Sequence, residues 1–136
     1  MADKDLTSYI HERMPLCATL GIEAEKLDAE SVIFTLQWAP GLCTSSGMLH
    51  GGAVMALADS AGGATAMANL PEGAIGTSTI ESKTNFLGAI REGEVRATSR
   101  PLHVGSTTIV IETELHNNDK LVAKVTQTQT VLRPRK

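Results

Sequence analysis

The feature that most constrains the fold is a run of small and apolar residues over positions 50–69, interrupted by a single carboxylate, Asp59. A run of this length and composition predicts a helix, which would span roughly 30 Å at the rise of an α-helix. Because the run is apolar on nearly every side, it predicts a helix enclosed by the rest of the fold. Gly62 and Gly63 inside it would each cost about 1 kcal/mol relative to alanine. They indicate a close backbone approach, room for a ligand, or a kink.

Segments with the residue patterns of strands precede and follow this helix in the sequence. A short helix is predicted over 4–14, ended by Pro15, followed by an apolar lead-in to the first strand. Strands are predicted over 22–28 and 31–38 before the long helix, and strands rich in Thr, Val and Ile over 75–87, 93–104, 107–116 and 121–132 after it. The last three should form an antiparallel meander, because the turns between them are short. This order predicts an α+β fold, with a curved antiparallel sheet wrapped around one long central helix.

Composition excludes several classes of protein. With 136 residues the chain predicts one domain over 1–136, and with 3% aromatic residues its core must be largely aliphatic. A net charge of −3 argues against a nucleic-acid partner. No uninterrupted apolar run reaches the roughly 18 residues of a membrane span, and the N-terminus lacks a secretory pattern. Cys17 and Cys43 have neither disulfide nor metal-site spacing. We therefore predict a cytoplasmic protein with no metal, no membrane association and no nucleic acid.

Asp59 needs an explanation of its own. Positions 55, 56, 62 and 63, which lie one turn away on the helix, carry no cation. Burying an unpaired carboxylate is expensive, so Asp59 either faces solvent, bonds to a group from elsewhere, or serves a reaction. Nine residues before it, at the helix start, stands His50-Gly51-Gly52.

These residues carry a resemblance that covers about 16–132. The segment 47–52, Asp59, Thr79 on the next strand, and the segments 85–87 and 93–95 resemble the hot-dog fold acyl-CoA thioesterases of the PaaI-like, phenylacetate-pathway type. The resemblance implies the hot-dog fold and hydrolysis of an acyl-CoA, or a related acyl thioester, to the free acid and CoA. It implies no cofactor beyond the coenzyme A of the substrate. It also implies a homo-oligomer, a dimer at least and a homotetramer by expectation.

The helix start and the acid suit this chemistry. The first turn of a helix presents unpaired N–H groups and a positive dipole end, and glycines let a ligand approach the backbone closely. The N–H of Gly51 or Gly52 would polarise the thioester carbonyl, a contribution of roughly 3 kcal/mol in the transition state; alternatively, the glycines only allow tight packing. Asp59 would act as a general base on water or would attack the carbonyl to give a mixed anhydride.

The spacing also predicts a shared site. Nine residues along a helix correspond to about 13.5 Å, which prevents His50 and Asp59 from pairing within one subunit. Similar enzymes solve this by dimerising, so that the carboxylate of one subunit faces the helix N-terminus of the other.

Further site residues come from the same resemblance. His50 would orient the thioester or fix the loop, and is the less favoured general base. Thr79 would hold the attacking water, or is simply a strand former. Thr44 stands where some relatives place an amide side chain that touches the thioester oxygen. His103 lies in a segment, 101–105, that resembles thioesterases acting on aryl thioesters, in which this histidine borders the pocket; Ser106 replaces the basic residue frequent there.

Two other classes fit the same fold. A hydratase or dehydratase usually carries different histidine motifs and a second acid, so His50-Gly51-Gly52 with a lone Asp59 argues against it. A non-catalytic acyl-CoA-binding protein should have lost the carboxylate, which is present. The acyl group itself is not identified by the sequence.

Overall fold

The computed structural model describes residues 1–135, in which six strands form one antiparallel sheet of order β1-β2-β4-β5-β6-β3. The strands are β1 Glu23–Leu27, β2 Val32–Gln37, β3 Gly76–Phe86, β4 Glu94–Val104, β5 Thr108–Asn117 and β6 Lys120–Leu132. Strands β4, β5 and β6 pair in succession, which confirms the predicted meander. Strand β3 pairs only with β6 and so forms one edge of the sheet, while β1 forms the other.

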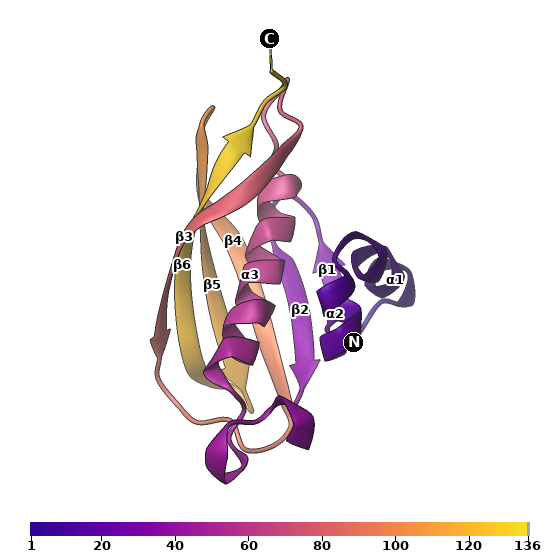
Figure 1. Cartoon of the computed structure of the whole chain (residues 1–136), viewed down its shortest axis with the longest axis vertical. Helices are drawn as coiled ribbons and strands as arrows, with labels where there is room; N and C mark the ends of the chain where they lie inside the picture. The colour runs from indigo at the N-terminus through magenta and orange to yellow at the C-terminus, as the bar shows by residue number, and fades with distance from the viewer. Residues whose placement is uncertain (136) are drawn as a thin grey trace.

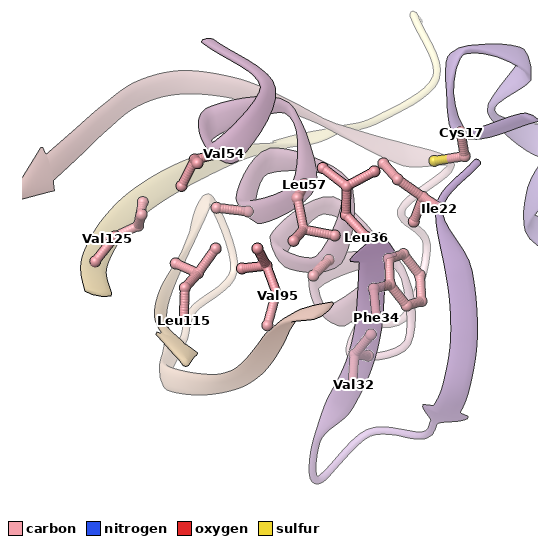
Figure 2. Close-up of a cluster of buried hydrophobic side chains, with 14 of the residues drawn as sticks. Cys17, Ile22, Val32, Phe34, Leu36, Val54, Leu57, Val95, Leu115 and Val125 are labelled. Atoms are coloured by element: carbon pink, nitrogen blue, oxygen red, sulfur yellow. The ribbon is translucent and has the colours of Figure 1, made fainter. Parts of the chain in front are cut away.

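The sheet curves around helix α3, Gly51–Met67, as predicted for the hot-dog fold (Figure 1). Alternation explains the inner face: Val32, Phe34 and Leu36 of β2 are all buried. Figure 2 shows Val54 and Leu57 of α3 among the side chains of the sheet. Full burial of one such aliphatic side chain contributes about 1.5–3 kcal/mol. The core is aliphatic, as the composition predicted, with Phe34 as its one fully buried aromatic side chain among residues 1–135.

The prediction that α3 is enclosed on all sides is wrong for the single chain. Gly52, Met55, Asp59 and Met67 are exposed along one side of the helix, which we call the exposed stripe. The physical reason is geometric: one sheet wraps only the side of a helix that it faces, and the opposite side stays open (Figure 1). The apolar composition of this side therefore has no explanation within one chain.

The N-terminal region contains two helices rather than one. Helix α1, Lys4–Arg13, is capped by the Asp3 carboxylate, which accepts hydrogen bonds from the backbone N–H groups of Asp5 and Leu6. The apolar lead-in predicted after Pro15 is wrong, because α2, Pro15–Leu20, occupies it. Pro15 ends α1 but also stands at the first turn of α2, where proline is favoured.

Two short 3-10 turns, η1 Pro40–Leu42 and η2 Ser45–Gly47, lie in the predicted loop before α3. No helix within residues 1–135 combines the length and the hydropathy needed to cross a membrane.

Candidate active site

The start of α3 leaves one backbone donor free. His50 is the N-cap residue, and its Nδ1 accepts a hydrogen bond of 2.7 Å from the N–H of Gly52. The N–H of Gly52 is therefore occupied in this structure. The N–H of Gly51 donates to no acceptor within residues 1–135. The ring of Phe86 lies against this glycine, since a Cβ there would be 3.2 Å from the Phe86 ring. Of the two glycines proposed as carbonyl donors, Gly51 is the available one.

The helix start is held by two segments of the chain. The N–H of Leu49 donates to the Ile90 carbonyl at 2.8 Å, and the N–H of His50 donates to the Leu42 carbonyl at 2.9 Å. Both bonds precede the first helical residue, so they fix the direction in which Gly51 points its N–H.

Asp59 is held by two side chains on one oxygen. The Thr79 hydroxyl donates to Oδ1 at 2.8 Å, and the Gln127 amide donates to the same atom at 3.1 Å. The other oxygen, Oδ2, accepts no hydrogen bond within residues 1–135. Asp59 is thus an exposed carboxylate with a fixed orientation and one free oxygen.

The Thr79 hydroxyl is oriented in turn by Gln129. The Gln129 amide donates to Thr79 Oγ1, and a hydroxyl has only one hydrogen to give. That hydrogen goes to Asp59. The register places Thr79 opposite Gln129, and a β-bulge follows between Thr79 and Glu81. The result is a directed chain of donors from Gln129 through Thr79 to Asp59.

The two glycines within α3 have different surroundings. A Cβ at Gly62 would lie 1.6 Å from Oε1 of Gln127, whereas a Cβ at Gly63 would meet nothing within 4 Å. Of the three explanations left open by the sequence, close approach applies to Gly62 and open space applies to Gly63. Only a glycine at position 62 lets the Gln127 side chain reach Asp59.

Sequence reasoning missed both glutamines. Gln127 and Gln129 are 0% and 1% exposed. They continue the inward-facing alternation of β6 after Ala123 and Val125. Two amides at positions where the strand pattern calls for apolar residues were the signal that could have found them.

The structure brings some predicted residues together and leaves others apart. Asp59 and Thr79 are in direct contact, whereas His50 bonds to its own helix start. Thr44 is exposed in the loop before α3, where its N–H donates to the Met48 carbonyl, and His103 is exposed near the end of β4. No hydrogen bond within residues 1–135 links Thr44 or His103 to Asp59. In the same range, no three His, Cys, Asp or Glu side chains are grouped to hold a metal ion.

Comparison with known proteins gives this geometry a family. The model of the "Thioesterase superfamily" matches residues 46–124. "Putative esterase ComA2" of Bacillus subtilis is 31% identical over 77% of this chain and 83% of its own length. A mutant of the thioesterase PA1618 from Pseudomonas aeruginosa has a TM-score of 0.85 at 27% identity, covering 93% of each chain. A phenylacetic acid degradation-related protein from Ralstonia eutropha has a TM-score of 0.80 at 26% identity, covering 87% of this chain and 90% of its own.

The matched segment contains both halves of the candidate site, His50-Gly51-Gly52 and Asp59, together with Thr79. The sheet and the central helix are those expected of the hot-dog fold. The chain belongs to the thioesterase superfamily.

Proposed function

We propose that this protein hydrolyses acyl-CoA thioesters to the free acid and CoA, with Asp59 as general base. The observation that carries the proposal is the fixed carboxylate with one free oxygen, Oδ2, on the exposed stripe of α3. Family membership supports thioester hydrolysis in general. The acyl-CoA substrate and the roles of the residues are the proposed part.

The reaction needs only water and the thioester. Oδ2 of Asp59 takes a proton from water as the water oxygen attacks the carbonyl carbon, and the carbonyl oxygen becomes an oxyanion. When the oxyanion collapses, the carbon–sulfur bond breaks, and the leaving sulfur of CoA takes the proton held by Asp59, which returns Asp59 to its carboxylate form. The Thr79 hydroxyl gives its hydrogen to Asp59 and accepts one from Gln129, which leaves its second lone pair to accept a hydrogen from the attacking water. This arrangement favours general base catalysis over the mixed anhydride.

Gly51 is the proposed donor to the oxyanion. Its N–H is free and stands at the positive end of α3. A donor in this position is worth about 2.7–4 kcal/mol in the transition state. His50 serves by capping the helix and so orienting Gly51, and Thr44 and His103 remain proposed contacts to the substrate.

The site is proposed to form between two subunits. Gly51 and Asp59 are about 12 Å apart along one helix, too far for one carbonyl to meet both. Strand β3 is an edge strand whose neighbour is missing on one side. It and its flanks expose large apolar side chains: Ile75 by 65%, Ile80 by 61%, Phe86 by 53% and Leu87 by 55%. An uncovered edge of this kind is a template for pairing with another chain, so we propose a dimer through β3.

The first test replaces the base. Asp59→Asn keeps the shape of the side chain and an acceptor for Thr79 and Gln127 but removes the proton acceptor. We expect kcat on acyl-CoA, followed by thiol release, to fall by about 10²–10⁴-fold with the fold intact by circular dichroism. Activity equal to that of the wild type would remove Asp59 from the mechanism.

The second test asks whether the site is shared. Gly51→Pro deletes the free N–H at a helix position that favours proline, and His50 already has the extended backbone, φ −63° and ψ 133°, that precedes proline. Subunits carrying Gly51→Pro are unfolded and refolded together with subunits carrying Asp59→Asn. In a shared site each mixed dimer regains one intact site, so activity should rise toward about a quarter of the wild type by two-fold symmetry. Activity that stays at the level of the two separate variants would refute a shared site.

A further inference from the structure

An apolar cavity of about 380 Å³ lies between the N-terminal helices and the second half of α3. This volume falls within the about 300–1,000 Å³ of small-molecule sites. Its walls come from both regions, with Tyr9, Ile10 and Arg13 of α1 facing Gly63, Ala64 and Met67 of α3.

The cavity starts close to Asp59. Gly63 follows Asp59 by four residues, which places it on the same face of the helix and about 6 Å further along the axis. Apart from the neighbouring residues and backbone of its own helix, no atom lies within 4 Å of where a Cβ of Gly63 would stand. Gly63, which lines the cavity, therefore places no side chain between the carboxylate and the cavity on the exposed stripe.

The chemistry of the walls selects an apolar occupant. Arg13 is the one charged side chain that lines the cavity within residues 1–135. Its guanidinium lies 4.9 Å from the centre of the Tyr9 ring, in the geometry of a cation–π contact. With the charged group placed over the ring, its methylene stem is available as an apolar wall. Apart from Tyr9 and Arg13, the lining residues carry aliphatic or thioether side chains, except Gly63, which has no side chain.

We propose that this cavity binds the distal part of the acyl chain, which makes medium-chain acyl thioesters the preferred substrates. This inference rests on the proposed function, because it takes Asp59 as the point where the thioester is held. A chain that runs from the carbonyl past Gly63 passes between α1 and α3 and fills the space lined by Met67 and Ala68. The structure thus assigns chain-length selection to the N-terminal helices as well as to α3.

The test fills the cavity at its far end. Ala68→Leu adds bulk at a lining position, and Met67→Trp narrows the cavity at a side chain that is 45% exposed and so tolerates the change. Ala18→Leu on α2 is the matched control, at an exposed position outside the lining. We measure kcat/KM for octanoyl-CoA and acetyl-CoA, and the Kd of the non-hydrolysable thioether S-octyl-CoA by calorimetry.

We expect the octanoyl-to-acetyl ratio of kcat/KM to fall at least about tenfold in Ala68→Leu and Met67→Trp, and the Kd of S-octyl-CoA to rise to a similar extent. The ratio in Ala18→Leu should match that of the wild type. An active enzyme whose ratio and Kd do not respond to either filling variant would overturn the cavity assignment and leave the proposed function standing. If the wild type hydrolyses no acyl-CoA but S-octyl-CoA binding still depends on Ala68, the cavity assignment stands and the proposed function fails.

Discussion

At the scale of single residues, the structure gives Gly62 and Gly63 different roles, which the sequence alone does not distinguish. One glycine accommodates the Gln127 amide and the other borders open space. Both positions carry the same residue type, and they differ only because strand β6 packs on the side of the helix where Gly62 lies. Asp59 and Thr79 could be predicted because each belongs to a pattern. The two glutamines could not be predicted so directly, because a buried amide in a strand looks like any polar residue until its partner is known.

Alanine at each glycine should give opposite results. Gly62→Ala places a methyl group where Gln127 Oε1 now lies, so the buried amide must leave Asp59. We expect a loss of about 1–3 kcal/mol in the free energy of unfolding and a lower kcat. Gly63→Ala meets no atom and gains about 0.5–1 kcal/mol from helix propensity. Urea unfolding of both variants checks this, and equal shifts in the two would contradict the structure.

The Thr79 hydroxyl should matter to both stability and turnover. Thr79→Val keeps a branched strand residue but removes the donor to Asp59 and the acceptor for the buried Gln129 amide. Leaving that amide unpaired should cost about 1–3 kcal/mol, and kcat should fall while KM changes less. Thr79→Ser retains the hydroxyl and is the control. Thermal unfolding and steady-state kinetics measure both effects; a serine variant as impaired as the valine variant would assign the role to packing instead.

At the scale of elements, the helices differ in how far the sequence predicts them. The long helix could be predicted from its apolar run, but α2 could not, because Pro15 reads as a stop signal when the next helix is only 6 residues long. The exposed stripe was also missed, since composition does not say which side of an apolar helix a neighbouring chain would cover.

The His50 cap predicts a graded effect on α3. His50→Ala removes the acceptor of the Gly52 N–H and should lower the free energy of unfolding by about 1 kcal/mol. His50→Asn supplies another capping acceptor and should restore most of that loss. Chemical denaturation compares the two variants with the wild type. If asparagine restores stability but not kcat, His50 has a role on the substrate beyond capping.

At the scale of the whole molecule, one ion pair fastens the N-terminal edge to the meander. Glu25 on β1 reaches across β2 and accepts two hydrogen bonds from Arg96 on β4. This guanidinium, and after it the N-terminal ammonium of Met1, which donates to Glu25 Oε1, lower the pKa of the Glu25 carboxyl. A carboxyl with a lowered pKa stabilises the folded state above its unfolded pKa of about 4.3, and that contribution is lost as the pH falls through the folded value.

The pH dependence of unfolding should report this pair. Glu25→Gln should lower the free energy of unfolding at pH 7 by about 0.2–1 kcal/mol, the usual range for ion pairs exposed to solvent. The difference from the wild type should shrink as the pH falls below about 4, where the wild-type carboxyl also becomes protonated. Glu12→Gln, at an exposed position with no ion pair within residues 1–135, is the control. A difference that stays constant from pH 7 to 3 would contradict an electrostatic origin.

The open edge of β3 has a consequence for how the protein behaves in a cell. Under the proposed shared site, a lone chain carries a fixed base and a free helix start that never meet on one substrate. Specific activity then falls on dilution below the dissociation constant of the dimer. Turnover would therefore begin only when the concentration of the protein is high enough for dimers to form, and a newly synthesised chain would be inactive until it binds a second copy.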